Sequence, residues 1–330
     1  MKKKRRYRVA LAGYYGFGNL GDELLLRACL EILELCGVGR ESVVVLSNAP
    51  EETGRNYHVV SVSRWSFSEV RGALSQSGTL LLGGGGLFQD SSSVRSCLWY
   101  WGLVRLARLC GARPWALGQS IGPLNSSLAR RLTKNALGSC AALQLRDAPS
   151  LEWSKRLGLK ATLGEDLALT LTPPRIEGDG GKRLLLNLRP APEARRFAAL
   201  VAPRVNAFEG EVVGTALSPE DRTLLETFRD DGTLRLSRVV LAKDLEDAGR
   251  LWSGASEAVG MRLHFAVLSA LYGTPLSVLP YDPKAAAFAE RTGAALVREA
   301  WREPAVPRLP VSREEIRDEA GRICRSVCGG

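Results

Sequence analysis

The sequence predicts an α/β protein built from two Rossmann-like, doubly wound lobes. Short apolar runs alternate with stretches of helical periodicity, and this alternation starts again after a stretch rich in proline and glycine. The length of 330 residues suits about two domains of ordinary size. Strands that alternate with helices favour parallel sheets, because the connection between parallel strands has to cross over the sheet.

The first lobe is expected over residues 1–172. Its predicted strands are 8–12, 42–46, 79–82, 114–117 and 142–145, and its predicted helices are 22–35, 68–76, 94–110 and 126–137. Residues 173–182 contain two prolines and three glycines without periodicity, so they are predicted to form a linker.

The second lobe is expected over residues 183–310, and a closing helix within 311–330. Its predicted strands are 183–188, 212–214, 236–241, 255–259 and 276–279, and the predicted helices are 219–228, 245–253, 263–272 and 311–327. Two such lobes are predicted to face each other across a ligand cleft at the carboxyl ends of both sheets.

The positive charge is concentrated at the N-terminus. Without the six basic residues of segment 2–8, the net charge of +10 falls to +4. The rest of the chain has no basic patch interleaved with aromatic residues, so nucleic-acid binding is not expected. The segment could hold the protein at an anionic membrane, and a solvated tail is the alternative interpretation. The six residues are Lys2, Lys3, Lys4, Arg5, Arg6 and Arg8.

The compartment is predicted to be the reducing cytoplasm. The seven cysteines are scattered without a CxxC pair, and there are only two histidines, so a structural zinc site is not expected. The apolar run Val9–Gly13 is too short for a secretory signal. The uncharged stretch 263–281 contains Gly273, Pro275 and Pro280, which favours a helix, a turn and a buried strand over a membrane span.

Glycine-rich loops are predicted at three strand ends. Gly16, Gly18 and Gly21 fit GxGxxG, but Asp22 would place negative charge where a pyrophosphate needs positive potential, so a dinucleotide site is disfavoured. The alternative is that Asp22 caps a helix. The other loops are Gly83–Gly86, followed by Gln89, and residues 118–123, which include Gln119. All three are expected at the ligand-binding edge of one sheet.

Four further candidates follow predicted strands. Arg146 ends the fifth strand, Arg262 leads into a helix, and Lys284 follows a late strand. If the lobes face each other, these cations would bind a small polyanion, and His264 near a helix start would suit proton transfer. The alternatives are surface ion pairs around Arg146 and a His264 satisfied within a core helix.

Six segments occur together in one order: GYYGFGNLGDE, LLLGGGGLFQD, GQSIGP, LRDAPS, GMRLHFAVLSALYGTP and YDPK. With these segments, roughly residues 8–290 resemble the polysaccharide pyruvyl transferases, most closely their bacterial CsaB-type branch. The resemblance implies a GT-B-like fold and transfer of pyruvate from phosphoenolpyruvate to a sugar, forming a cyclic ketal with release of phosphate. It also implies a β-linked N-acetylmannosamine acceptor on a lipid-linked precursor of a secondary cell wall polymer, whose product would anchor surface-layer proteins. No metal or cofactor is expected.

The resemblance also implies roles for individual residues. Arg262 and His264 match an RLH motif that contacts phosphoenolpyruvate, with His264 as the general acid, and Arg146 and Lys284 match further donor-binding positions. Asp22 is a candidate base. Contacts to the acceptor, or contacts within the glycine-rich loops of this chain, are expected from Asn19, Gly84, Gly85, Gln89 and Gln119. Segment 190–208 does not align with the family.

One alternative keeps the fold and changes the reaction. A GT-B glycosyltransferase would use the glycine-rich loops and the basic residues to hold the diphosphate of a nucleotide sugar. Thermal stabilisation by UDP but not by phosphoenolpyruvate would favour that alternative.

Overall fold

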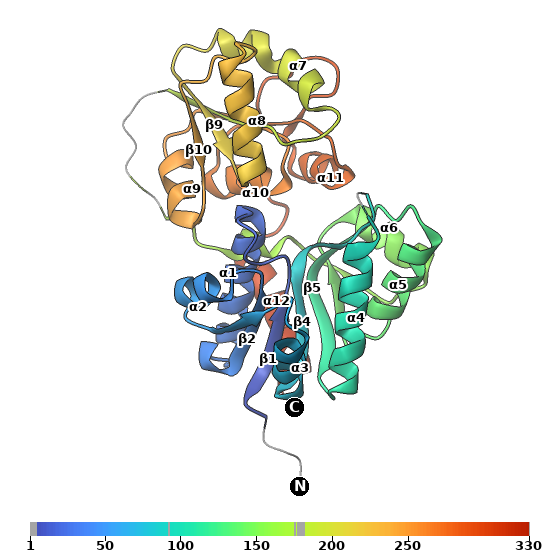
Figure 1. The fold of residues 1–330 in the computed structure, drawn as a ribbon. Helices are drawn as coiled ribbons and strands as arrows, with labels where there is room; N and C mark the ends of the chain where they lie inside the picture. The colour runs from blue at the N-terminus through green and yellow to red at the C-terminus, as the bar shows by residue number, and fades with distance from the viewer. Residues whose placement is uncertain (1–4, 92, 175, 177–181, 330) are drawn as a thin grey trace. The chain divides into compact units, whose positions relative to one another are not determined.

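The computed structural model describes residues 5–91, 93–174, 176 and 182–329. Two compact units make up the chain, each with its own parallel sheet, so the predicted α/β class with two doubly wound lobes is confirmed (Figure 1). The first unit comprises residues 1–17, 25–171 and 313–330, and the second comprises residues 18–24 and 172–312.

The first unit contains a seven-stranded parallel sheet with strand order β3-β2-β1-β4-β5-β6-β7. Its strands are β1 (Tyr7–Ala12), β2 (Val43–Ser47), β3 (Val60–Ser63), β4 (Ser77–Phe88), β5 (Arg113–Ile121), β6 (Leu143–Leu145) and β7 (Thr162–Leu163). Its helices are α1 (Leu20–Leu35), whose first residues belong to the second unit, η1 (Arg40–Ser42), α2 (Pro50–Tyr57), α3 (Phe67–Ser75), α4 (Arg95–Leu109), α5 (Ser127–Leu137), α6 (Ala148–Leu157), η2 (Leu167–Thr170) and α12 (Arg313–Cys328).

The predicted elements of this unit all occur, and several further elements, whose apolar signals are weak, were not predicted. Helix α2 buries only Thr53, and every residue of β3 is partly exposed, so neither shows a clear hydrophobic period. Helix α6, strand β7 and η2 were also missed. Short elements of this kind depend on tertiary packing more than on local pattern.

The run Gly83–Gly86 was expected to form a loop, and this prediction was wrong. The glycines lie inside β4, because β5 continues to pair with them at Gly83–Leu117 and Gly85–Gln119. They allow close packing: a Cβ on Gly83 would lie 2.3 Å from the hydroxyl oxygen of buried Tyr15. Glycine is rare in strands, which is why the sequence pattern ended this strand at residue 82.

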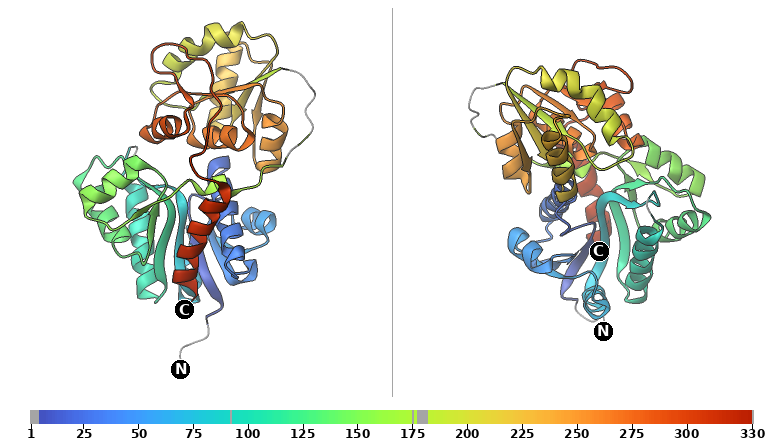
Figure 2. Two further views of the ribbon diagram at one scale, coloured as in Figure 1. Left: turned by 180° about the vertical axis from the view of Figure 1, so that it is seen from behind. Right: turned by 45° about the horizontal axis from the view of Figure 1, so that its top comes forward.

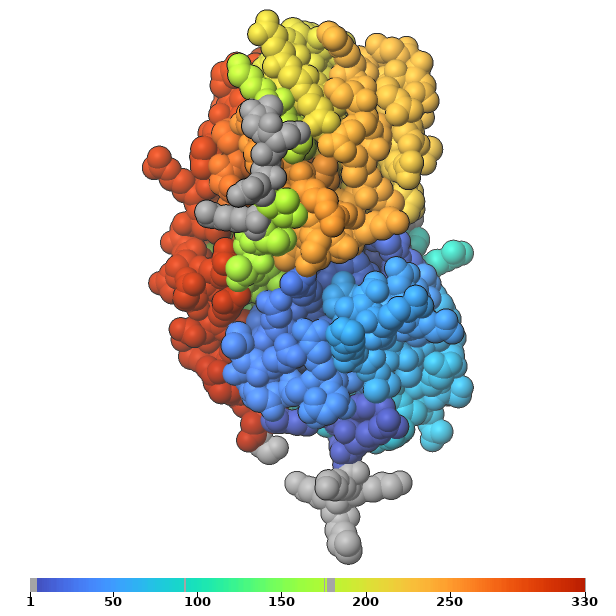
Figure 3. All heavy atoms as spheres, turned by 90° about the vertical axis from the view of Figure 1, so that its left-hand side faces the viewer, coloured from blue at the N-terminus to red at the C-terminus, as the bar shows by residue number. Residues whose placement is uncertain are grey.

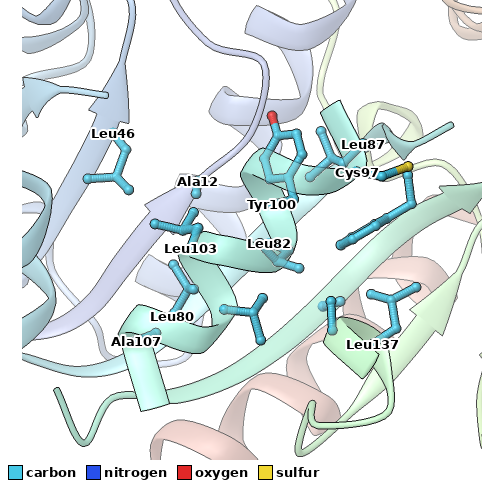
Figure 4. Packing of buried hydrophobic residues seen from close by; sticks show 14 of the residues in the cluster. Ala12, Leu46, Leu80, Leu82, Leu87, Cys97, Tyr100, Leu103, Ala107 and Leu137 are labelled. Carbon is cyan, nitrogen blue, oxygen red and sulfur yellow. The ribbon is translucent and has the colours of Figure 1, made fainter. Parts of the chain in front are cut away.

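Helices cover both faces of the first sheet. Helices α3, α4 and α5 pack side by side over one face, and α12 lies on the other (Figures 1 and 2). The core between α4 and the sheet consists of close-packed aliphatic side chains such as Leu80, Leu82 and Leu103, with Tyr100 beside them (Figure 4). The sheet is therefore buried on both sides, as parallel sheets require.

The closing helix belongs to the first unit. Helix α12 buries Ile316, Ala320, Cys324 and Val327, a stripe at helical spacing, and it packs against η2 and β4. The first unit thus differs from the expected first lobe, 1–172, in lacking residues 18–24 and in including α12. Helix α12 is assigned to the first unit because of its packing contacts, although it follows the second unit in the sequence.

Two arginines of the basic N-terminal segment bind the ends of helices. Arg5 donates to the carbonyl of Gly111 just beyond α4, at 2.7 Å. Arg8 donates to the carbonyls of Gly37 beyond α1 and of Cys328 at the end of α12, each at 2.8 Å. Cations are favourable at the negative ends of helices, so these two charges have a structural role. Residues Lys2–Lys4 lie outside the described residues, as do residues 175 and 177–181 of the expected linker.

The second unit contains a six-stranded parallel sheet with strand order β10-β9-β8-β11-β12-β13. Its strands are β8 (Arg183–Asn187), β9 (Glu211–Ala216), β10 (Arg238–Leu241), β11 (Glu257–Gly260), β12 (Leu276–Val278) and β13 (Ala295–Leu296). Its helices are α7 (Ala194–Asn206), α8 (Pro219–Asp230), α9 (Leu245–Trp252), α10 (Leu263–Tyr272) and α11 (Pro283–Thr292). Figure 3 shows the surface that α8, α9 and the edge strand β10 form, in yellow and orange.

Helix α7 lies in the segment that did not align with the family, and α11 was also missed. Alanines and arginines dominate α7, yet it buries Phe197, Val201 and Val205 in the core of this unit. The uncharged stretch 263–281 forms α10 and β12, as predicted. Among the described residues, no helix is long and apolar enough to cross a membrane.

Candidate active site in the second unit

Arg262 lies at the carboxyl edge of the second sheet, where β11 gives way to α10. Its backbone is extended, and its amide donates to Asn187 Oδ1 at the end of the neighbouring strand β8, at 3.1 Å. The order of strands reverses direction between β8 and β11, and such a switch point is where open α/β sheets bind ligands. Local backbone structure therefore presents Arg262 at the position that the fold favours for a ligand.

The guanidinium of Arg262 is held by residues at the start of α8, the helix that follows β9. It contacts both carboxylate oxygens of Asp221, with Nη2 to Oδ1 at 2.7 Å, and donates to Ser218 Oγ at 2.9 Å. The Asp221 side chain is fully buried, while that of Arg262 keeps 14% of its surface exposed. Burial acts to lower the pKa of Arg262, but Asp221 outweighs it and raises that pKa. The group is a fixed cation.

The segment 18–24 belongs to this unit through direct contacts. The amide of Leu20 donates to the carbonyl of Leu217, before α8, at 2.9 Å. A Cβ on Gly21 would lie 2.1 Å from Nδ1 of His264, so the imidazole rests directly on the backbone of this glycine. The negative charge of Asp22 also acts on Arg262. The glycine-rich loop of the N-terminal sequence and the RLH segment thus form one cluster.

Asn19 and Asp22 are joined within this segment. Asn19 Oδ1 accepts from the amide of Gly21 at 3.2 Å, and Asn19 Nδ2 donates to Asp22 Oδ2 at 2.6 Å. Asn19 thus caps α1, the role that the alternative interpretation gave to Asp22. The Asp22 carboxylate is oriented by Asn19 in the first turn of the helix.

Lys284 lies at the same edge, in the first turn of α11. Its side chain is only 10% exposed, and Nζ lies 4.0 Å from Oδ2 of Asp282, the capping residue of the helix. Arg262 and Lys284 therefore place two positive charges on one edge of one sheet, each beside a carboxylate.

Arg146 has a different setting, in the first unit. Its guanidinium donates to Asp166 Oδ2 and to Ser120 Oγ, both at 2.7 Å, and both members of the ion pair are about 5% exposed. Ser120 in turn donates to Asp147, the cap of α6. The contacts of Arg146 join β5, β6 and η2.

Four other candidates also lie in the first unit. Gly84 and Gly85 are strand residues with positive φ. Gln119 is fully buried in β5, where Nε2 donates to the carbonyl of Leu82 at 3.2 Å and Oε1 has no partner among the described residues. Gln89 follows β4, and its Oε1 accepts from Ser91 at 2.7 Å.

Comparison with protein families gives one match. The model of the polysaccharide pyruvyl transferases spans residues 19–283. This chain belongs to the polysaccharide pyruvyl transferase family. The matched range begins at Asn19 and ends just before Lys284, so it includes Asp22, Arg262 and His264. Comparison with curated proteins found no match.

Solved structures agree with the fold of this pyruvyl transferase family member. Anabaena HepE in complex with UDP-glucose is 11% identical, with a TM-score of 0.58 over 97% of this chain and 95% of that one. The S. aureus MnaA–UDP co-structure is 8% identical, with a TM-score of 0.61 over 96% and 87%. The UDP-GlcNAc 2-epimerase of Methanocaldococcus jannaschii is 10% identical, with a TM-score of 0.58 over 96% and 92%. These likenesses show the GT-B-like fold alone.

The residues that surround Arg262 in this family member were not predicted from the sequence. Arg189 comes two residues after β8, and its Nη1 donates to the hydroxyl of Tyr281 at 2.7 Å, while its buried Nε has no partner among the described residues. Burial raises the pKa of Tyr281. A basic residue just beyond a strand was the signal that selected Arg146, and it applies equally to Arg189. The pairing of Arg262 with Asp221 has no sequence signal, since Ser218–Asp221 reads only as a helix start.

No cluster of three or more potential metal ligands occurs among the described residues.

Proposed function

We propose that this protein transfers the enolpyruvyl unit of phosphoenolpyruvate to two hydroxyls of a sugar, forming a pyruvate ketal and releasing phosphate. The observation that carries the proposal is the cluster of Arg262, His264 and segment 18–24 at the switch point of the second sheet. Phosphoenolpyruvate carries a phosphate and a carboxylate, and arginine and lysine side chains suit both groups.

Arg262 and Lys284 are proposed to bind the donor. Asp221 and Ser218 fix the guanidinium of Arg262 before any ligand arrives, so little reorganisation is needed when an anion binds. Arg189 is a third cation of this edge, because its charge acts on Glu220 and Tyr281 together with that of Arg262. Arg146 remains a predicted donor contact, and its charge is already paired with Asp166.

His264 is proposed as the general acid. It would protonate the methylene carbon of phosphoenolpyruvate, which leaves an oxocarbenium-like centre at the neighbouring carbon. One sugar hydroxyl adds there and loses its proton, phosphate leaves with the electron pair of the C–O bond, and the second hydroxyl closes the ketal. The two hydroxyl protons restore the acid and neutralise the phosphate. Asp22, oriented by Asn19, is the proposed base. This sequence of steps needs no metal or cofactor.

The acceptor is proposed to be a β-linked N-acetylmannosamine on a lipid-linked precursor of a secondary cell wall polymer. This follows from the CsaB-type resemblance of the motifs within the matched range. The ketal adds a negative charge to the polymer, which suits the anchoring of surface-layer proteins. Acceptors of this kind are carried by the inner face of the membrane, where the basic segment 2–8 would favour anionic lipid. We propose peripheral contact there for the charges other than Arg5 and Arg8, which bind helix ends.

The test is phosphate release from phosphoenolpyruvate, with and without a synthetic β-linked N-acetylmannosaminyl disaccharide. Release that depends on the disaccharide, together with a product heavier by one pyruvate ketal in mass spectrometry, is the expected result. A protein stabilised by UDP, and inactive with phosphoenolpyruvate and every disaccharide offered, would instead be a glycosyltransferase.

A further inference from the structure

Exposed aromatic side chains gather at one place on the first unit. Among the described residues, the exposed aromatic side chains are Tyr14, Trp65 and Phe67, at 43%, 62% and 70% of their surface. Tyr14 follows β1, and Trp65 and Phe67 follow β3. Tyr14 and Trp65 therefore belong to loops, and Phe67 begins α3, at the carboxyl edge of the first sheet, the edge that binds ligands in this class of fold.

Three of the rings at this edge form a corner. Tyr14 and Phe17 are stacked, with ring centroids 3.9 Å apart and planes 8° from parallel. Trp65 stands edge-on to Phe17, with centroids 6.4 Å apart and planes at 89°. We call Tyr14, Phe17 and Trp65 the aromatic platform. It consists of two aromatic walls that meet at about a right angle.

A buried arginine contacts the rings of the aromatic platform and fixes their position. Arg64 is 6% exposed, and its guanidinium carbon lies 5.1 Å from the ring centroid of Phe17 and 5.3 Å from that of Trp65. Nη1 donates to the carbonyl of Gly13, at the end of β1, at 2.9 Å. Cation–π contacts to several rings and an anchor on the strand hold the walls in place before a ligand binds.

A polar side chain contacts the platform. Asn48, at the end of β2, accepts a hydrogen bond from Trp65 Nε1 at 2.7 Å and donates to the carbonyl of Gly16 at 3.1 Å. Aromatic faces beside an amide match a pyranose, which has an apolar face of C–H groups and a rim of hydroxyls. A lipid chain would instead need a continuous apolar groove. The chemistry of the platform thus favours a sugar ring.

Two members of the platform, Tyr14 and Phe17, lie in the glycine-rich loop that carries the candidate base. Only two peptide bonds separate Phe17 from Asn19, so their Cα atoms lie within about 7.6 Å of each other. We infer that the aromatic platform is a saccharide subsite, in which a pyranose ring of the acceptor stacks against Tyr14 and Trp65. This inference rests on the proposed function, because it assigns the acceptor of that reaction.

The experiment measures disaccharide binding by calorimetry and disaccharide KM by phosphate release. The probes are a panel of soluble disaccharides that includes the β-linked N-acetylmannosaminyl one. Trp65→Ala and Tyr14→Ala are expected to weaken binding and raise this KM about two- to tenfold, with the donor KM unchanged. Trp65→Phe should retain most of the affinity. Leu109→Ala, which alters another exposed apolar side chain of the same unit, should change nothing.

Three results separate this inference from the proposed function. The subsite inference is overturned if both alanine variants bind the disaccharide with wild-type affinity. It is also overturned if none of the disaccharides shows binding that Trp65→Ala weakens. Unchanged disaccharide binding with reduced binding to phosphatidylglycerol vesicles assigns the platform to the membrane and also overturns it. Disaccharide binding that depends on Trp65 in a protein that releases no phosphate from phosphoenolpyruvate supports the subsite and refutes the proposed function. Melting temperatures of all variants show that they fold.

Discussion

The guanidinium of Arg262 and the carboxylate of Asp221 form a two-pronged ion pair beneath the carboxyl edge of the second sheet. Asp221 also accepts from the amide of Leu217, at 3.2 Å, and is fully buried. The pair therefore fixes the position of Arg262, the proposed donor-binding residue, so loss of this one contact is expected to affect both stability and donor binding.

Arg262→Ala is expected to impair the protein in two ways. Removing one partner leaves Asp221 as an uncompensated buried charge, which costs about 3–5 kcal/mol in the free energy of unfolding. It should also raise the KM for phosphoenolpyruvate. Urea denaturation and steady-state kinetics measure the two effects. Arg229→Ala, which breaks the exposed pair of Arg229 with Asp230, is the matched control and should change neither.

The double variant Arg262→Ala/Asp221→Ala distinguishes the structural role from the binding role. It removes both charges, so it should recover much of the lost stability while the donor KM stays high. A double variant with wild-type donor KM would show that Arg262 does not bind phosphoenolpyruvate.

His264→Ala is expected to lower kcat by about 10²- to 10⁴-fold, the usual contribution of a positioned acid. The donor KM should change much less, since other residues are proposed to bind the phosphate and the carboxylate. His58→Asn is the control, because His58 has a positive φ of 53° that asparagine tolerates. Near wild-type turnover in His264→Ala would remove the proposed acid.

Gly21→Ala tests the contact between the N-terminal loop and His264. Alanine in place of glycine normally stabilises a helix by about 0.5–1 kcal/mol. Here the new Cβ would lie 2.1 Å from His264 Nδ1, so the imidazole has to move and kcat should fall by at least about tenfold.

Gly72→Ala is the matched control for Gly21→Ala, since Gly72 lies in α3 and a Cβ there has no atom within 4 Å. It should raise the melting temperature slightly and leave the kinetics unchanged. Equal behaviour of the two variants would mean that the position of His264 does not depend on Gly21.

Cys328 is expected to be the thiol that reacts most readily near neutral pH. A hydrogen bond with Cys324 lowers the pKa of Cys328 to about 7 against the effect of burial, whereas burial raises the pKa of Cys29 to about 12. Alkylation by iodoacetamide, followed by peptide mass spectrometry, should show a midpoint near pH 7 for Cys328 and no labelling of Cys29 below about pH 10.

The lowered pKa of Cys328 also determines the direction in which the stability of the folded protein changes with pH. Between pH 7 and about 8.5 the unfolded chain binds more protons at this thiol than the folded chain does. The stabilisation is therefore fully present above about pH 8.5 and is lost as the pH falls through 7. Cys328→Ser should remove this dependence. A labelling midpoint near 8.5 in the folded protein would contradict the assignment.

The sequence by itself determined the α/β class and the restart of the alternation after residue 172, and it selected the candidate residues of the site. Strand and helix periodicities are local properties, and residues just beyond strands in a parallel sheet necessarily lie at one edge. This was enough to select Arg262, His264 and Lys284 without knowing their neighbours.

Only the tertiary structure decided which residues lie together. It continued β4 through Gly83–Gly86, because pairing with β5 and packing of Tyr15 outweigh the poor strand propensity of glycine. The tertiary structure also brings Gly21 against His264 and Asp221 against Arg262. The first pair is separated by 243 positions in the chain and the second pair by 41. Such pairings depend on how strands order themselves in the sheet, and no local pattern of residues encodes that order.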